Sequence, residues 1–290
     1  MKKVLLVLLL LIPLNSFANE LTVRYPRAES PTQEKLRQYY VDLLQMVLEK
    51  TEKSDGPFQL KKSATSMLRK DLIESLSKGL GLEVMWLMTN KEREDLLLPV
   101  RIPLLKGTMG YRALIIRDKD RKRFESIKNL ADLRNLTAVQ GDVWMDTRIL
   151  EANGLPVTGV KGYESMFFLI SKGKYDYFPR GINEIWKEVE THKGKGLSVE
   201  ENIVLHYDSP MYFFVNGSNA ALAERIERGL RLAIEDGSFD NHFYNHPLHR
   251  ETFEKTNLRS RKIFRLDNPY LPEGTPLEDR TLWLDPWQIP

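Results

Sequence analysis

Apolar and polar positions along the chain predict strands and helices in turn. Leu21 to Tyr25 alternates apolar and polar residues, as a half-buried strand does, and Pro26 ends the pattern. From Gln33 to Lys50 apolar residues recur at helical spacing, and a second strand is predicted from Phe58. The pattern after residue 20 therefore predicts strand, helix, strand.

Longer apolar runs follow. Residues 67–76 repeat apolar positions at helical spacing, and Gly79 to Gly81 separates this predicted helix from the apolar run Leu82 to Met88. A nearly continuous apolar strand between helices is typical of a parallel α/β sheet covered on both faces. A further long strand is predicted over Gly110 to Ile116.

Shorter elements then predict a second, smaller α/β unit. A strand over residues 136–141 precedes Asp142, which we expect to cap a helix running to Glu151. Further elements are predicted as helix 163–171, strand 174–178, helix 182–190, strand 211–215 and amphipathic helix 220–234.

The last 40 or so residues are rich in proline and contain Trp283 and Trp287. Proline excludes long helices and central strands. We expect this segment to pack onto the body as an irregular strap, with docking of a partner protein as the alternative.

The N-terminus has the layout of a cleavable secretory signal. Lys2 and Lys3 precede the apolar run Val4 to Ile12, and small residues lead to Ala18. The run is shorter than the roughly 20 residues of a membrane span, although a retained anchor is the alternative. We expect cleavage after Ala18, a soluble periplasmic product and no stable membrane insertion after cleavage.

Composition removes several classes of function. The chain has no cysteine, which excludes disulfides, thiolate metal sites, a cysteine nucleophile and a lipoprotein anchor. The 290 residues include 43 Lys and Arg against 40 Asp and Glu, and two of the lysines belong to the predicted signal. Basic residues are spread among acids, so we expect no nucleic-acid partner.

No catalytic or metal pattern is visible in the sequence. His242, His246 and His249 form the one histidine cluster, but Pro247 interrupts it and no carboxylate completes a known zinc motif. We expect a solvated helix terminus there, no metal and no cofactor.

Several segments carry short motifs in a definite order. Residues 81–93 are similar to a D-x6-T-x-x-R segment, residues 130–141 to L-x-G-x-x-V-x-V-x-x-G, residues 169–177 to L-x-x-G-x-x-D-A, and residues 222–238 to a closing motif ending in D-G-S. Together they resemble the amino-acid type of extracellular solute-binding protein, periplasmic solute-binding protein family 3, over about residues 20–246. The resemblance implies the α/β, two-lobed type II periplasmic-binding-protein fold with two crossover segments. Lobe one would comprise residues 19–111 plus 216–290, and lobe two residues 112–215.

The resemblance also implies ligand-binding residues in lobe one. Arg93 matches the arginine that binds the ligand carboxylate in this family, and Thr89, one residue out of the usual spacing, would supply a hydroxyl. The alternative is a surface ion pair of Arg93 with Glu92 or Asp95.

In lobe two the resemblance predicts an unusual charge pattern. Asp142 stands where the family presents hydroxyl groups to the ligand carboxylate, and Arg180 stands near the position of the acid that binds the α-ammonium. This arrangement favours a ligand more anionic than a neutral amino acid, or one whose carboxylate is held from lobe two. The alternative for Arg180 is a helical ion pair with Glu184.

Aromatic and basic residues near predicted strand ends complete the candidate site. Tyr25, Trp86 and Trp144 could pack on a ligand or belong to the core. Arg24 and Arg27 flank the end of the first strand, where they could bind ligand or solvate a turn.

The resemblance therefore implies a monomeric binding protein and not an enzyme. It would capture a small polar ligand, either anionic or amino-acid-like, and present it to an inner-membrane permease of an ABC transporter or to a sensor. One alternative is a periplasmic dehydratase-like enzyme that uses Asp142 or Asp176 near Arg93. Another is a degenerate lobe pair that binds a protein.

Overall fold

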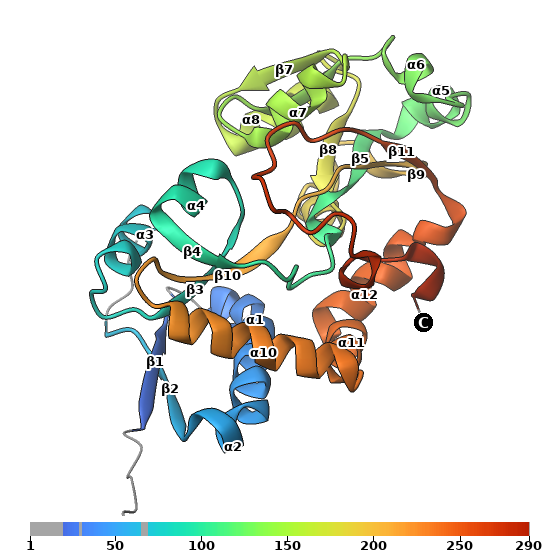
Figure 1. Cartoon of the computed structure of the whole chain (residues 1–290). Helices are drawn as coiled ribbons and strands as arrows, with labels where there is room; N and C mark the ends of the chain where they lie inside the picture. Colours follow the sequence, from blue (N-terminus) through green and yellow to red (C-terminus); the bar gives the residue numbers. More distant parts are fainter. Residues whose placement is uncertain (1–19, 29–30, 65–68, 290) are drawn as a thin grey trace, which may run out of the picture.

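The computed structural model describes residues 20–28, 31–64 and 69–289, so the predicted signal lies outside the described residues. Figure 1 shows two α/β lobes, one above the other, joined by extended segments. The first lobe carries the sheets β1-β2 and β3-β10-β4, and the second carries β11-β9-β5-β8 and β6-β7. None of the described helices is both long and apolar enough to cross a bilayer.

The first lobe begins with the predicted strand-helix-strand unit, which the structure confirms. The two strands of this unit pair with each other in parallel, and the chain between them contains a long helix. The elements are β1 (Leu21–Tyr25), α1 (Pro31–Lys50), α2 (Glu52–Asp55), β2 (Phe58–Lys62), α3 (Arg69–Ser77), β3 (Val84–Met88), α4 (Lys91–Leu96), β4 (Leu97–Val100), β10 (Met211–Asn216) and α10 (Ala220–Glu235).

Strand β3 is buried as its apolar run predicts, but its ladder differs from the prediction. It pairs antiparallel with β10, and β10 also pairs antiparallel with β4. The expectation of a parallel sheet at β3 is therefore wrong, because a strand from a distant part of the sequence returns between β3 and β4.

The second lobe is built on the long strand β9, which the sequence pattern did not predict. Strand β5 lies between β9 and β8, and β6 pairs in parallel with β7. The elements are β5 (Tyr111–Arg117), α5 (Arg121–Glu125), α6 (Leu130–Leu133), β6 (Ala138–Gly141), α7 (Met145–Ala152), β7 (Val157–Val160), α8 (Tyr163–Ser171), β8 (Phe178–Gly181), α9 (Ile185–Thr191) and β9 (Leu197–His206).

The C-terminal part of the chain contacts both lobes. It contains α11 (Ser238–Asn245), α12 (Pro247–Thr256) and β11 (Lys262–Arg265), and β11 pairs in parallel with β9. Strand β10 begins at Met211, inside the range predicted for lobe two, yet it pairs within the first lobe. The exact lobe boundaries remain a prediction.

The predicted strap is confirmed over Trp283. This side chain is 8% exposed, its indole N–H donates to the Pro276 carbonyl at 2.9 Å, and the Leu284 N–H donates to the Lys106 carbonyl at 2.7 Å. A Cβ on Gly107, whose φ is +74°, would lie 2.5 Å from the Trp283 ring. Trp287, in contrast, is 72% exposed.

The histidine cluster belongs to the packing of the first lobe. The rings of His242 and His249 each lie 4.6 Å from the Tyr39 ring, and His249 Nδ1 bonds to the Phe243 carbonyl. The expectation of a solvated helix terminus is wrong for His249, which is buried. Pro247 starts α12 instead of only ending α11. Within the described ranges no group of three His, Asp or Glu residues could hold a metal ion.

Helices α1 and α10 cross in close contact at Gly229. A Cβ at this position would lie 2.1 Å from the Val47 carbonyl oxygen. Only hydrogen therefore fits here without moving one helix.

We expect Gly229→Ala to lower the free energy of unfolding by about 1–3 kcal/mol through overpacking, although alanine has the higher helix propensity. Gly217→Ala is the matched control, because its Cβ would meet an atom only at 3.9 Å. Urea denaturation measures both. Equal stability of the two variants would contradict the close crossing.

Candidate functional site

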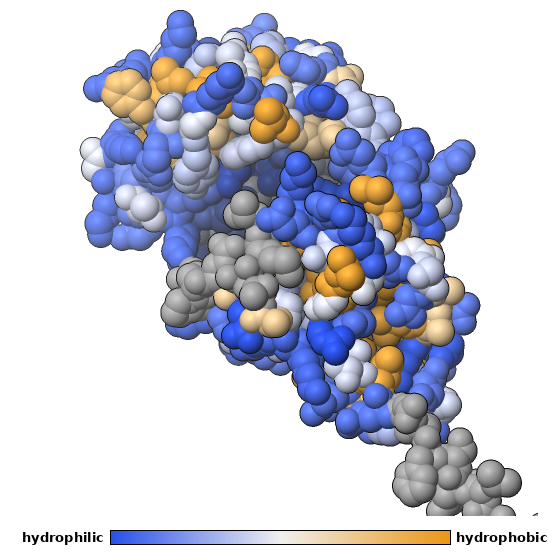
Figure 2. All heavy atoms as spheres, turned by 90° about the vertical axis from the view of Figure 1, so that its left-hand side faces the viewer, coloured by the Kyte–Doolittle hydropathy of each residue, from blue (hydrophilic) through white to orange (hydrophobic). Residues whose placement is uncertain are grey.

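Two cavities are lined by residues of both lobes. Figure 2 shows a recess between the lobes with a largely hydrophilic rim. The larger cavity, about 890 Å³, lies between α4, the start of α7 and strap residues 269–273. The smaller, about 490 Å³, lies between α1, β3 and the turn after β8.

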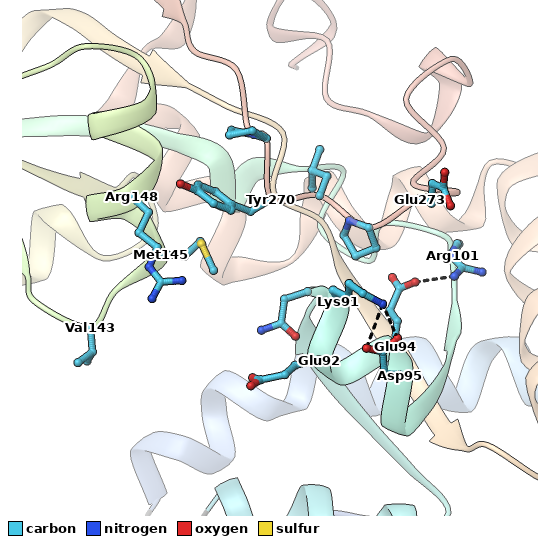
Figure 3. Close-up of a pocket in the computed structure, with 14 residues that line it drawn as sticks. Lys91, Glu92, Glu94, Asp95, Arg101, Val143, Met145, Arg148, Tyr270 and Glu273 are labelled. Atoms are coloured by element: carbon cyan, nitrogen blue, oxygen red, sulfur yellow. Dashed lines mark hydrogen bonds and ion pairs between the residues drawn. The ribbon is translucent and has the colours of Figure 1, made fainter.

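The larger cavity has a charged wall whose groups pair within the first lobe. Lys91 Nζ lies 2.9 Å from Asp95 Oδ1, and Arg101 pairs with Glu94, as Figure 3 shows. Arg148 comes from the opposite side, on α7. The Lys91 and Asp95 side chains are mostly exposed, so the interaction is screened by water.

The smaller cavity has the composition that ligand sites commonly have, which is apolar walls with a few polar groups. Its first-lobe wall includes the partly buried rings of Tyr40 and Trp86, which stack with centroids 4.9 Å apart and an interplanar angle of 15°. Asn183 and Glu184 line it from the second lobe. This cavity is therefore our candidate ligand site.

Arg180 does not line either cavity but lies behind Glu184. It is 8% exposed, and its Nη2 lies 2.9 Å from Glu184 Oε2 and 2.6 Å from Glu188 Oε1. Burial alone would lower the pKa of Arg180, but its hydrogen bond to Glu188 and the charges of both glutamates raise it overall. The alternative of an Arg180–Glu184 pair is confirmed.

The Arg180 guanidinium also lies over aromatic rings. Its central carbon is 5.0 Å from the centroid of Trp144 and 5.2 Å from that of Phe178. Trp144 is thereby packed between α7 and β8, and it does not line either cavity. Arg180 is thus surrounded by its own carboxylates and rings, so its charge is already balanced inside the lobe.

A second buried cluster joins the crossover region to α7. Arg112 on β5 donates from Nε to the Tyr207 hydroxyl at 2.7 Å, and its Nη2 lies 2.9 Å from Asp146 Oδ1. The Tyr207 hydroxyl donates to the same Asp146 oxygen. Sequence reasoning missed this cluster, although an arginine inside the apolar run 110–116 was a signal that a buried partner must exist.

Arg93 and Thr89 lie close together on the first lobe but face their own chain. Arg93 donates from Nη1 to the Met88 carbonyl, and its backbone N–H donates to Asn90 Oδ1, which caps α4. The Thr89 hydroxyl donates to Glu94 at 2.5 Å. Neither residue is among those that line the two cavities, so their role in binding remains a prediction.

The expectation that Asp142 caps a helix is wrong. Helix α7 begins at Met145, its N-cap is Trp144, and no side chain caps it. The reason is strand pairing: the Asp142 N–H donates to the Val160 carbonyl, which carries the β6–β7 ladder one residue further. Asp142 is exposed on the surface.

The candidate ligand-binding residues at the end of β1 contact other residues of the first lobe. Tyr25 belongs to the core, and burial raises the pKa of its hydroxyl. Arg24 forms an ion pair with Glu83 at 2.9 Å, and Arg27 Nε donates to the Ser63 carbonyl at 2.9 Å. Asp176, which the enzyme alternative invoked, pairs with Arg123 and accepts the Thr137 N–H.

Comparison with known proteins shows the fold. No protein-family profile and no curated protein matches the chain. Solved structures do match: YckB from Bacillus subtilis has 17% identity and a TM-score of 0.52 over 86% of this chain and 97% of its own. The probable amino-acid ABC transporter extracellular-binding protein YtmK from Bacillus subtilis has 16% identity and a TM-score of 0.53 over 77% and 95%.

The periplasmic VFT2 domain of BvgS from Bordetella pertussis has 14% identity and a TM-score of 0.50 over 77% of this chain and 91% of its own. Each match covers at least 91% of the other chain and at least 77% of this one. The chain therefore has the two-lobed type II periplasmic-binding-protein fold that its sequence motifs predict.

Proposed function

We propose that the protein is a periplasmic solute-binding protein that closes its two lobes on a small polar, amino-acid-like ligand. The observation that carries this proposal is the cavity of about 490 Å³ lined by Tyr40 and Trp86 from the first lobe and by Asn183 and Glu184 from the second. A ligand that contacts both walls favours the closed arrangement, because only there does it make both sets of contacts.

The charged groups beside this cavity support capture without chemistry. Arg180, Glu188 and Glu184 bind one another, as do Arg112 and Asp146. The Tyr39 hydroxyl, which lines the cavity, donates to the backbone carbonyl of Leu104 at 2.6 Å and not to a base.

The proposal includes a membrane partner. YtmK is described as a probable transporter binding protein and VFT2 as a periplasmic domain of BvgS. By analogy of fold alone, this chain would present its ligand to a permease or to a sensor. A monomer exported by the predicted signal suits either role.

A thermal-shift screen of residues 19–290 tests the proposal with amino acids, dicarboxylates and peptidoglycan fragments. We expect at least one compound to raise the melting temperature, because a ligand at 100 times its Kd stabilises the folded state by about 2.7 kcal/mol. Trp86→Ala should abolish that shift, and Trp287→Ala, at an exposed position, should retain it. A flat response to every compound would contradict solute binding and favour the protein-binding alternative.

A further inference from the structure

We infer that the C-terminal strap, between Leu266 and Leu284, is an additional connection between the lobes and restrains the opening of the cleft. Lobes that are joined only by crossover segments can rotate apart about those segments. A strap fixed to both lobes resists that rotation, because opening has to pull on its two ends. The inference rests on the lobe movement of the proposed function and adds a structural limit to it.

One end of the strap is fixed to the second lobe. Leu266 follows β11, is buried in the core of this lobe, and donates its N–H to the His206 carbonyl at 2.8 Å. Asn153, the C-cap of α7, exchanges two hydrogen bonds of 2.8 Å with the backbone of Asp267, as donor to its carbonyl and as acceptor from its N–H. This end therefore moves with β9 and α7.

The other end is fixed to the first lobe. The Leu284 N–H donates to the Lys106 carbonyl at 2.7 Å, and Lys106 Nζ donates to the Thr281 carbonyl at 3.2 Å. The same ammonium pairs with Asp240 on α11, which packs on α10. Trp283 is buried in the core cluster that also contains the buried faces of α1 and α10. This end therefore moves with the first lobe.

Between the two ends the strap passes through the space between the lobes. Figure 1 shows it in dark red, leaving β11, crossing in front of the second lobe and descending to α12. Residues 269–273 line the larger cavity together with α4 and α7, and Figure 3 shows Tyr270 on the side of Arg148. A Cβ at Gly274 would lie 3.5 Å from Nε of Arg101, which follows β4. The strap thus meets both walls of this cavity.

Straightening the strap would cost contacts inside it. The Thr275 hydroxyl donates to the Pro272 carbonyl at 2.8 Å, and the Trp283 indole N–H donates to the Pro276 carbonyl at 2.9 Å. The three prolines of residues 269–276 also fix φ and reduce the number of conformations that the strap can adopt. When the lobes separate, either these bonds or the bonds at the two ends have to break, so the strap opposes opening.

This restraint favours binding without touching the ligand. A protein whose lobes cannot separate widely loses less conformational freedom when it closes. The fraction of molecules that are competent to close on a ligand is correspondingly larger. We therefore expect the ligand-free protein to sample a narrow range of opening.

Lengthening the strap tests the restraint in the absence of any ligand. Six Gly and Ser residues inserted after Gly274 keep both ends of the strap fixed but add up to about 20 Å of reach. Spin labels at Leu80→Cys on the first lobe and Phe168→Cys on the second, which are 61% and 55% exposed in the original protein, report the separation. Pulsed electron spin resonance should show a shift to longer distances and a broader distribution.

The same six residues inserted after Gly194 are the matched control. Gly194 lies in the exposed turn between α9 and β9, within the second lobe, and a Cβ there would meet no atom within 4 Å. This insertion should leave the distance distribution unchanged. Melting temperatures of both insertion variants separate a loosened strap from a loss of folding.

Asn153→Ala tests the end of the strap on the second lobe, since it removes both bonds to Asp267. Asn135→Ala is its control, because the Asn135 amide donates only to the Asp132 carbonyl at the end of α6. We expect the first variant to broaden the distribution toward longer distances and the second to leave it unchanged.

Two results would separate the restraint from the proposed function. If the lengthened strap and Asn153→Ala both leave the ligand-free distribution as it is in the original protein, the strap does not restrain the lobes, whatever the thermal-shift screen shows. If the lengthened strap broadens the distribution while no compound raises the melting temperature, the restraint is supported and solute binding is wrong.

Discussion

Arg180→Met is expected to lower the free energy of unfolding by about 3–5 kcal/mol, the usual cost of removing one partner from a buried ion pair. Arg180 is 8% exposed, and Glu188, its closest carboxylate partner, has a side chain only 11% exposed. Without the guanidinium, Glu184 and Glu188 would be left as two like charges in a partly desolvated site. Chemical denaturation at neutral pH measures the loss.

Arg123→Met is the matched control for this prediction. Arg123 pairs with Asp176 at 2.6 Å, but its side chain is 49% exposed, so we expect a change of about 0–1 kcal/mol. The double variant Arg180→Met with Glu188→Leu should recover part of the lost stability, because it removes one of the stranded charges. Similar losses for Arg180→Met and Arg123→Met would show that the Arg180 cluster is not a buried network.

Stability is also expected to fall as the pH decreases from about 6.5 to 5, because buried histidines resist protonation. Burial, together with the charge of Arg265, lowers the pKa of His206 to about 3, and burial lowers that of His249 to about 4. In the unfolded chain both would titrate near the ordinary histidine value of about 6.5. Below that value the unfolded state binds more protons than the folded state, so acid favours unfolding.

The size of this effect follows from proton linkage. Each histidine contributes up to about 1.4 kcal/mol per pH unit, so the two together give up to about 2.7 kcal/mol per unit once the unfolded chain is protonated. Lowered pKa values of His242 and His246, mainly through burial, act in the same direction. Urea denaturation at pH 7.5, 6.5, 5.8 and 5.0 measures the slope.

His206→Phe isolates one contribution. The His206 ring lies 4.1 Å from the Tyr111 ring, so phenylalanine can keep the aromatic contact while removing the titrating group. We expect the slope of the unfolding free energy against pH to decrease by up to about 1.4 kcal/mol per pH unit, which is the contribution of one proton. If this variant has the same pH slope as the original protein, or if the stability of the original protein does not change with pH, His206 is not buried in its neutral form.

The sequence predicted the parts of the fold that depend on local pattern. Period-two alternation located β1, and helical spacing located α10, whose buried residues include Leu222, Ile226 and Leu230. Strand β9 escaped prediction because Glu200, Glu201 and Asn202 interrupt its apolar pattern. The Glu200 carboxylate accepts backbone N–H groups of Asn202 and Ile203, which satisfies a buried charge in the middle of the strand.

The site was harder to predict, because tertiary pairing decides which side chain faces the cleft. In the register of β5 and β8, Arg180 lies opposite Ala113 and is buried, and the acid four residues later reaches the cavity instead. On α1, Leu36 is 52% exposed although it lies within the apolar pattern that predicts this helix, and Arg37, beside it, is less exposed. Neither outcome can be read from spacing alone.

Closure of the lobes on a ligand is the central claim, and the missing cysteines allow it to be measured directly. Leu96→Cys at the end of α4 and Ala152→Cys at the end of α7 would place one spin label on an exposed position of each lobe without competing thiols. Pulsed electron spin resonance then gives the distance between the labels with and without a saturating concentration of a compound that raises the melting temperature. The account predicts a shift to a shorter, narrower distance distribution. An unchanged distribution at ligand saturation would contradict it.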